Sequence, residues 1–414
     1  MKTMFKIIGI IVLLLMVQNL SAQDELNQYL AVAAENNPGV KAKFNEYLAA
    51  LEKVPRVGTL PDPQVSFGYF IQPVETRVGP QRAKISASQM FPWFGTLGAK
   101  RDIATEMAKS KYETFEAAKS ELFYKVKANW YNLYFTQKAI GITRENINIL
   151  QIFRKISLSK VESGQASTVD VLRVEIEISD LENQLALLND KYTAQQAGFN
   201  NLLNVEENRT VLIPDSLKNE TLAYSREAIL DSIRQVNPAL HQLDYMASAY
   251  EQQESLARKS GSPNIMVGAD YIITGKSNMP EVSGSGKDAI VFPMVGISVP
   301  IYQKKYASME KEAQLMQQSV EAQKADRTNK LESDFETANK DYNDAGRRIP
   351  LFKLQSERAN KALSILQTEY ETDGKNFEEI LRMERQLLKY KLELEKARSD
   401  KGAAIAYIEY LMGQ

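Results

Sequence analysis

The sequence has no cysteine and only one histidine, His241, among its 414 residues. Without cysteine the fold has no disulfide to stabilise it, and no cysteine near the N-terminus can carry a lipid. A zinc site would lack most of its usual ligands, and we expect His241 to be an ordinary helix residue. We therefore expect no metal and no other cofactor.

A charge imbalance and long internal apolar runs are also missing. The chain has 51 basic and 52 acidic residues and a net charge of -1, so there is no electrostatic reason to expect nucleic acid as a partner. Mean hydropathy is -0.35, and no internal apolar run approaches the ~20 residues of a membrane-spanning helix. Phosphate-binding loops, Gly-x-Ser-x-Gly elbows and nucleophile–histidine arrangements are absent, so we do not expect an enzyme.

The N-terminus carries the one apolar run, "IIGIIVLLLMV" (7–17), after Lys2 and Lys6 and before the small residues Ser21 and Ala22. A basic start, a short apolar segment and small residues at a cleavage position are typical of a secretory signal peptide. We predict a signal peptide over residues 1–22 and a mature chain starting near Gln23, exported and not lipidated. An uncleaved membrane anchor is the alternative.

Four pairs of segments recur in the same order about 200 residues apart. They are "NNPGV" and "VNPAL" (36–40, 236–240), "PQVSFGY" and "PNIMVGA" (63–69, 263–269), "FPWFGTLGA" and "VPIYQKKYA" (91–99, 299–307), and "ESGQASTVDVLRVE" and "ETDGKNFEEILRME" (162–175, 371–384). This order predicts a tandem duplication. We assign residues 23–204 to the first repeat, 205–225 to a linker and 226–414 to the second repeat.

Each repeat reads as helix, strand, turn, strand, very long helix, tight turn and helix. Alternating apolar residues over 63–72 and 263–273 predict strands with one apolar face, and 82–91 and 289–299 are their partner strands. Apolar spacings of three and four over 174–202 and 380–411 are typical of coiled-coil seams. A helix over 97–162 would be roughly 100 Å long. Its counterpart after Pro300 should kink or break at Gly346 and Pro350.

Four amphipathic strands cannot close a barrel by themselves, and open sheet edges are not tolerated in lipid. Two copies would give eight strands and an interior filled by side chains, whereas three copies would give twelve strands and a lumen. Strands of about ten residues have the length needed to cross a bilayer. A soluble sandwich on a helical stalk is the alternative.

The whole mature chain resembles the TolC-like outer-membrane efflux family. The resemblance rests on the duplicated plan, on Phe91-Pro92 and Val299-Pro300 at the strand ends, and on Gly164 followed by Asp170-Val171-Leu172. It implies an α+β membrane protein, a homotrimer whose 12-stranded β-barrel is continued by a long α-helical coiled-coil barrel. The location implied is the outer membrane of a Gram-negative-type cell, in contact with its lipid, with a periplasmic extension.

The same resemblance assigns roles to the strand-to-helix elbows and to the chemistry of transport. Pro92, Gly95 and Pro300 would form the elbows, while Trp93 and Phe94 would either meet the membrane interface or pack within the elbow. The implied function is the channel of a tripartite efflux system, with a periplasmic adaptor and an inner-membrane pump of the RND type. The elbow sequence resembles the heavy-metal branch, but drug efflux and type I protein secretion stay open. The alternative is a periplasmic coiled-coil adaptor without a pore.

The periplasmic end carries the residues that the resemblance links to gating. Asp170 matches an acidic position that holds the closed tip, and Glu379 matches one at the pore constriction, where a carboxylate ring selects cations. Arg382 stands where relatives often have a second acid, and it either alters selectivity or pairs with Glu379. Tyr370 joins the tip network or packs in the seam. The adaptor-docking tips would be Gly164, Gln165, Gly374 and Lys375; the alternative for both acids is an ordinary solvated charge near a helix start.

Overall fold

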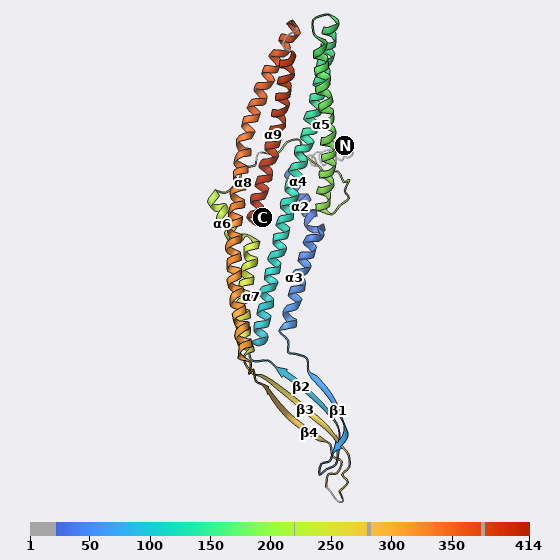
Figure 1. Cartoon of the computed structure of the whole chain (residues 1–414), viewed down its shortest axis with the longest axis vertical. Helices are drawn as coiled ribbons and strands as arrows, with labels where there is room; N and C mark the ends of the chain where they lie inside the picture. The colour runs from blue at the N-terminus through green and yellow to red at the C-terminus, as the bar shows by residue number, and fades with distance from the viewer. Residues whose placement is uncertain (1–21, 219, 280–282, 374–376) are drawn as a thin grey trace, which may run out of the picture. The chain divides into compact units, whose positions relative to one another are not determined.

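The computed structural model describes residues 22–218, 220–279, 283–373 and 377–414. The predicted signal peptide therefore lies almost entirely outside the described residues, as do Gly374 and Lys375. In chain order the first elements are α2 (Ala22–Asn36), α3 (Pro38–Val57), β1 (Gln64–Val74), β2 (Gln81–Phe91), α4 (Thr96–Glu162) and α5 (Thr168–Leu203). The same order of element types recurs in α6 (Arg226–Val236), α7 (Pro238–Ser260), β3 (Asn264–Thr274), β4 (Ala289–Ser298), α8 (Gln303–Asp373) and α9 (Phe377–Leu411) (Figure 1).

Two helices, and not the single predicted one, precede each pair of strands. The interruption falls at Asn37-Pro38 and at Asn237-Pro238, and α3 and α7 each begin at the proline. Proline is favoured as the first residue of a helix because the N–H it lacks would have no partner there. The Asn37 side chain caps α3 by accepting hydrogen bonds from the Gly39 and Val40 amides at 2.9 and 3.2 Å. The prediction of one continuous helix at these places was wrong because it overlooked the Asn-Pro pair, at whose proline a new helix begins.

The described chain divides into two compact units. We call residues 43–115 and 239–327 the sheet unit, and residues up to 42, 116–238 and 328–414 the helical unit. The long helices α4 and α8 each contribute residues to both. None of the described helices has the length and apolar character needed to span a bilayer.

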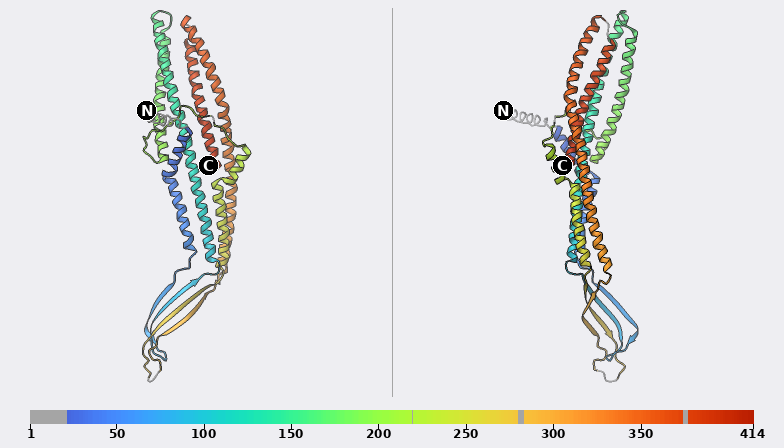
Figure 2. Two further views of the ribbon diagram at one scale, coloured as in Figure 1. Left: turned by 180° about the vertical axis from the view of Figure 1, so that it is seen from behind. Right: turned by 60° about the vertical axis from the view of Figure 1, so that its left-hand side comes forward.

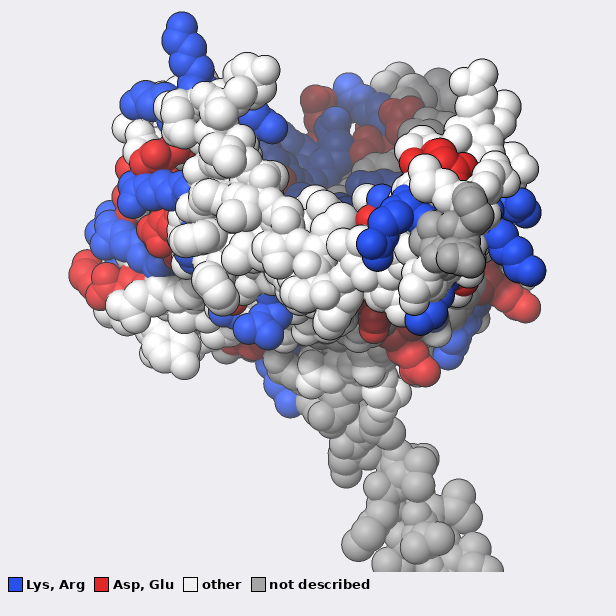
Figure 3. All heavy atoms as spheres, turned by 90° about the horizontal axis from the view of Figure 1, so that it is seen from below, with Lys and Arg blue, Asp and Glu red and all other residues white. Residues whose placement is uncertain are grey.

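The sheet unit contains one antiparallel sheet with the strand order β1-β2-β3-β4, so β1 and β4 are its outer strands. Phe67 pairs with Ile85, Ile85 with Tyr271, and Tyr271 with Ile290, which makes one apolar row across all four strands. All four side chains of this row are exposed. Figure 3, which views the molecule from below the orientation of Figure 1, shows a central area without Lys, Arg, Asp or Glu and charged residues on either side of it.

The opposite face of the sheet is polar. Ser66 pairs with Ser86 and Ser86 with Asp270 in the register, one position along from the apolar row. Lys84 on β2 forms an ion pair with Asp270 on β3 at 2.5 Å, and the Asp270 side chain is nearly buried. Through β1, β2 and β3 the period-two alternation therefore sets a polar row opposite the apolar one, and on β4 this row continues with Val291.

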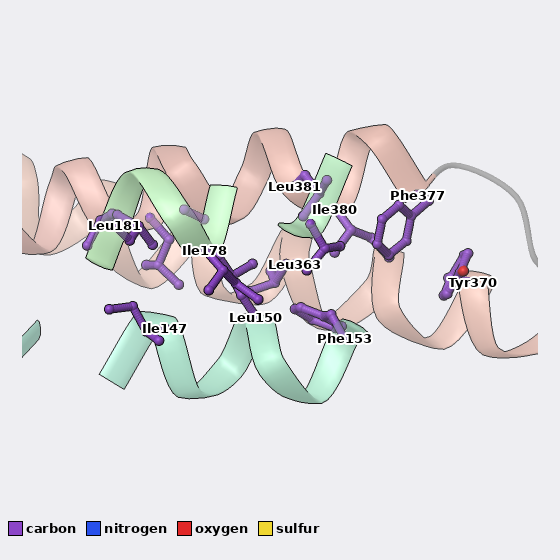
Figure 4. Packing of buried hydrophobic residues seen from close by; sticks show 14 residues of the cluster. Ile147, Leu150, Phe153, Ile178, Leu181, Leu363, Tyr370, Phe377, Ile380 and Leu381 are labelled. Carbon is purple, nitrogen blue, oxygen red and sulfur yellow. The ribbon is translucent and has the colours of Figure 1, made fainter. Parts of the chain in front are cut away.

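The helical unit is built from two antiparallel helix pairs. Figures 1 and 2 show α5 beside α4 and α9 beside α8. The seam between the pairs is a continuous cluster of buried side chains from all four helices (Figure 4), which includes Ile147, Leu150, Phe153, Ile178, Leu181, Leu363, Tyr370, Phe377, Ile380 and Leu381. Spacings of three and four along each helix put these side chains on one face, which is the coiled-coil pattern.

Helix α8 is not broken at Gly346 and Pro350, because it runs without interruption from Gln303 to Asp373. A proline inside a helix loses one backbone hydrogen bond, and its ring crowds the carbonyl group four residues earlier. That earlier residue is Gly346, whose backbone is free to adjust because it carries no side chain. Of the predicted kink or break, the break was wrong, because the two residues were treated as two separate faults, whereas their spacing lets one accommodate the other.

The segment that we predicted to be a linker, residues 205–225, follows the surface of the helical unit and has no helix or strand among its described residues. The Leu212 amide donates to the Tyr29 hydroxyl at 2.9 Å, and the Asn200 side chain donates to the Glu207 and Arg209 carbonyls at 2.9 and 2.7 Å. These bonds fix the linker against α2 and α5.

Candidate gate at the hairpin tips

The first hairpin tip, which connects α4 to α5, turns at Gly164. This residue has a φ of 72°, in the left-handed region that favours glycine. The Gly164 amide donates to the Val161 carbonyl at 3.0 Å, and the Gln165 amide donates to the Lys160 carbonyl at 2.8 Å. This pair of bonds is the Schellman motif, which ends a helix and satisfies its last carbonyl groups. Gly164 and Gln165 thus lie at the turn where the sequence placed them.

Helix α5 begins directly after this turn, and Asp170 lies in its first turn. Ser167 is the N-cap residue, and its hydroxyl accepts a hydrogen bond from the Val169 amide at 3.2 Å. The Asp170 side chain is only 16% exposed and lies 3.8 Å from the Arg173 guanidinium. Arg173 also reaches Glu378 of α9 at 3.2 Å. Asp170 is therefore connected through Arg173 to the second hairpin.

Glu379 and Arg382 lie at the start of α9 and form an ion pair with each other. The Glu379 side chain is 45% exposed and that of Arg382 is 68% exposed. The pairing that the sequence left open is therefore present. Among the described residues, neither side chain forms an ion pair with Asp170 or Arg173.

Tyr370 lies inside the seam near the end of α8. Its side chain is 2% exposed, and its ring centroid lies 5.0 Å from that of Phe377. Burial is the main reason that the pKa of Tyr370 is raised, and the nearby Asp170 carboxylate raises it further. Within the described chain, neither the Tyr370 nor the Ser157 hydroxyl reaches hydrogen-bonding geometry with any group. Tyr370 thus packs in the seam and is close enough to Asp170 to be affected by its charge.

Lys160 connects the two hairpins in a way that the sequence did not predict. It lies in the last turn of α4, and its ammonium group donates to the carbonyl oxygens of Tyr370 and Glu371 at 2.7 and 3.2 Å. The same ammonium group lies 4.9 Å from the centroid of the Tyr370 ring. Helix α8 has no basic residue in its own last turn, so Lys160 supplies the cation that favours a helix C-terminus.

Three further charged groups near the tips were also missed. Arg385 of α9 reaches Glu177 of α5 at 3.8 Å, and burial raises the pKa of Glu177, whereas Arg385 lowers it and Asp180 raises it. Glu384 is 1% exposed and accepts a hydrogen bond from the Asn146 side chain at 3.3 Å. Burial is the main reason that the pKa of Glu384 is raised. The sequence signal that could have identified Glu384 is its position, because a glutamate among the apolar residues of the predicted seam is unusual.

The elbows are built differently in the two repeats. Gly95 has a φ of 77°, and the amides of Thr96 and Ala99 donate to the Trp93 and Gly95 carbonyls at 3.0 and 2.9 Å, so α4 starts within a tight turn after Pro92. In the second repeat, the Gln303 side chain donates to the Pro300 carbonyl at 2.8 Å.

The aromatic residues of the first elbow are largely open to the surroundings. Phe94 is 81% exposed and Trp93 is 39% exposed, and their ring centroids lie 5.9 Å apart.

His241 is half-buried in α7. Within the described ranges, no three or more His, Asp or Glu side chains gather in a way that could hold a metal ion. The groups at the tips are charges and helix caps, which can hold two hairpins together and change the field around them.

Comparison with known proteins gives a family match over part of the chain and the fold over nearly all of it. Residues 30–205 match the family described as "Outer membrane efflux protein". No curated protein matched the sequence significantly.

Three solved channels have the same fold over nearly the whole chain. The outer-membrane channel OprN is 16% identical with a TM-score of 0.78, covering 94% of this chain and 90% of its own. The outer membrane protein VceC of Vibrio cholerae is 14% identical with a TM-score of 0.76, covering 95% and 98%. The MtrE outer membrane channel of Neisseria gonorrhoeae, in its open state, is 15% identical with a TM-score of 0.74, covering 94% and 89%. Residues 30–205 therefore match the outer membrane efflux protein family, and the described chain has the fold of these solved outer-membrane proteins.

Proposed function

We propose that three copies of this chain form one channel through the outer membrane, the exit duct of a tripartite efflux system. The observation that carries the proposal is the four-stranded sheet, which has an exposed apolar row and two outer strands, β1 and β4. In lipid, every strand edge must be paired, because no water is available to the free backbone groups. Pairing β4 of one copy with β1 of the next keeps the antiparallel alternation and satisfies both edges.

The number of copies follows from the width of the barrel. Eight strands leave an interior that side chains fill, whereas twelve strands leave a lumen. The apolar row of Phe67, Ile85, Tyr271 and Ile290 would face lipid. The polar face, with its Lys84–Asp270 ion pair, would line the water-filled lumen. The exposed Trp93 and Phe94 would lie at the inner membrane interface.

The helical hairpins would continue the duct into the periplasm, and their tips would control it. Asp170, Glu379 and Arg382 would surround the constriction, with Arg173 linking Asp170 to the second hairpin. Because Glu379 and Arg382 neutralise each other in a pair, we expect weaker cation selection than an unpaired carboxylate ring would give. Gly164, Gln165, Gly374 and Lys375 would meet the periplasmic adaptor, and an RND-type pump in the inner membrane would supply the energy. The cargo could be metal ions, drugs or a secreted protein.

The channel proposal is tested by mass and by conductance. The detergent-solubilised chain should have the mass of a trimer and give single-channel currents in planar bilayers. A monomer with no currents would overturn the proposal and favour the poreless adaptor.

The gate is tested by Asp170→Ala combined with Glu379→Ala. This double variant releases Arg173 and Arg382 from one carboxylate partner each, so we expect a larger closed-state conductance and a shift towards anion preference. The matched control is Glu182→Ala with Glu357→Ala, which removes two exposed acids elsewhere in the helical unit. Conductance and selectivity equal to those of the wild type would show that Asp170 and Glu379 are ordinary surface charges.

A further inference from the structure

An open groove of about 620 Å³ lies in the sheet unit, next to the first elbow. Its walls are the end of α3, the connector that follows it, the first turns of α4, and Leu256 of α7. We call it the elbow groove. Its volume is within the range of pockets that take small organic ligands.

The connector that forms one wall is held in place at both ends. The Thr59 hydroxyl donates to the Arg56 carbonyl at 2.9 Å, which closes the end of α3. The Gln89 side chain of β2 donates to the Pro61 carbonyl at 2.7 Å. Gly58 lies against the Arg101 side chain so closely that a Cβ there would be 3.4 Å from the Arg101 Cβ. The groove is therefore fixed by specific contacts to the sheet and to α4.

The lining combines an apolar floor with a basic rim. The apolar side chains are Val57, Leu60, Leu97, Ile103, Met107 and Leu256. Three cations, Lys53, Arg56 and Lys100, line the same groove, where Asp62 is the one acidic side chain. A ligand with an apolar chain and a negatively charged head matches both parts.

These three cations have no carboxylate partner in the described part of the chain, and all three are exposed. The basic residue at the end of α7 behaves differently, because Arg258 pairs with Glu254 and, at 2.8 Å, with Glu310. Carboxylates thus neutralise Arg258 but leave the three cations of the groove without a neutralising partner. An anion that entered the groove would not have to compete with an internal ion pair.

The position of the groove identifies the source of such a ligand. It adjoins the elbow, where the exposed Trp93 and Phe94 mark the membrane interface if the proposed channel is correct. Leu60 of the lining is itself 44% exposed. On that basis, which rests on the proposed function, the groove would face the inner leaflet at the level of its headgroups. Basic side chains at this level attract anionic lipid.

We propose that the elbow groove binds an anionic phospholipid of the inner leaflet, with the phosphate between Lys53, Arg56 and Lys100 and part of one acyl chain on the apolar floor. The bound lipid would link α3 to the start of α4.

The test uses native mass spectrometry of the detergent-solubilised full chain with phosphatidylglycerol or phosphatidylethanolamine at equal mole fraction. The rim variant combines Lys53→Gln, Arg56→Gln and Lys100→Gln. The matched control combines Lys330→Gln, Lys361→Gln and Lys389→Gln, three exposed lysines of the helical unit. Leu60→Asn probes the floor while leaving all charges in place.

The wild type should retain phosphatidylglycerol in preference to phosphatidylethanolamine. The rim variant should lose phosphatidylglycerol affinity by roughly fivefold per removed cation, and Leu60→Asn by several-fold for both lipids. The control variant should match the wild type. Three results would overturn the proposal: phosphatidylglycerol retention by the rim variant equal to that of the wild type, the same loss of phosphatidylglycerol in the control variant as in the rim variant, or no preference between the two lipids. Cross-links that show a second copy covering the groove would do the same.

Conductance in bilayers of phosphatidylethanolamine alone separates this inference from the proposed channel. A chain that conducts as a trimer but does not bind phosphatidylglycerol at the rim would overturn the groove alone. A chain that forms no channel and yet binds phosphatidylglycerol through these cations would overturn the channel alone.

Discussion

Replacing Lys160 with methionine removes the ammonium group at the C-terminal end of α8 and keeps a side chain of similar shape. In the wild type this group donates to the Tyr370 and Glu371 carbonyls at 2.7 and 3.2 Å and lies 4.9 Å from the centre of the Tyr370 ring. Since α8 has no basic residue in its own last turn, nothing on that helix can replace the lost donor. We therefore expect the end of α8 to open more often.

The size of the effect follows from these contacts. A hydrogen bond from a charged donor contributes about 1.5–3 kcal/mol, and a cation over an aromatic ring at a partly exposed site contributes about 0.5–1 kcal/mol. Glu371 is exposed, so water replaces its bond at little cost, and the shorter bond to Tyr370 dominates. We expect a loss of about 2 kcal/mol, which is a factor of about 30 in the local opening equilibrium.

Hydrogen exchange of the backbone amides measures this opening directly. The amides of residues 366–373 should exchange about thirtyfold faster in Lys160→Met, while those of residues 330–345 in the same helix should not change. Lys160→Arg should retain most of the protection, because its guanidinium can still donate. Lys155→Met, at an exposed lysine nearby on α4, is the matched control. If residues 366–373 exchange equally fast in Lys160→Met and in this control, the cross-hairpin cap makes no contribution.

Three more substitutions test other parts of the helical unit. Burial holds the pKa of Glu384 above its ordinary value. Between the pKa of the unfolded chain and that of the folded chain, the folded chain therefore keeps a proton that the unfolded chain has lost, and stability falls as pH rises. Glu384→Gln should raise the thermal midpoint more at pH 8 than at pH 4.5, and an equal gain at both pH values would contradict this. Gly402→Ala places a Cβ 2.3 Å from the Tyr131 ring and should cost about 1–3 kcal/mol in denaturant unfolding, whereas Gly198→Ala, with no atom within 4 Å, should cost nothing. Gly164→Ala puts a side chain at a φ of 72° and should cost about 1–2 kcal/mol, seen as faster exchange over residues 158–168, with Gly164→Asn affected less.

Periodic features could be predicted from the sequence because each depends on neighbours in the chain. The predicted helix from Leu97 to Glu162 is observed as Thr96–Glu162, and the strand predicted over 82–91 is observed as Gln81–Phe91. Gly164 was placed at its turn because glycine among polar residues after a long helix is a helix-stop signal. The spacing of apolar residues likewise predicted the seam between the helices, in which Ile178, Leu181 and Ile380 are buried.

The network at the tips could not be predicted in the same way. Arg173 contacts Asp170 within one helix, but its contact with Glu378 joins residues far apart in the chain, and a single sequence does not show which helices face each other. Lys160 acts on carbonyl groups, which carry no sequence signal at all. Pro350 was interpreted from its own helix propensity, although the residue four positions earlier decides whether the helix continues.

The sheet has a consequence for the cell that makes the protein. Each newly made copy presents the outer strands β1 and β4, of 11 and 10 residues, with backbone groups that any extended peptide could pair with. Until a partner strand arrives, such a copy is a template for aggregation as much as a building block. Overexpression therefore sets two rates against each other: the rate at which each outer strand pairs with its intended partner, and the rate at which it pairs with the wrong peptide.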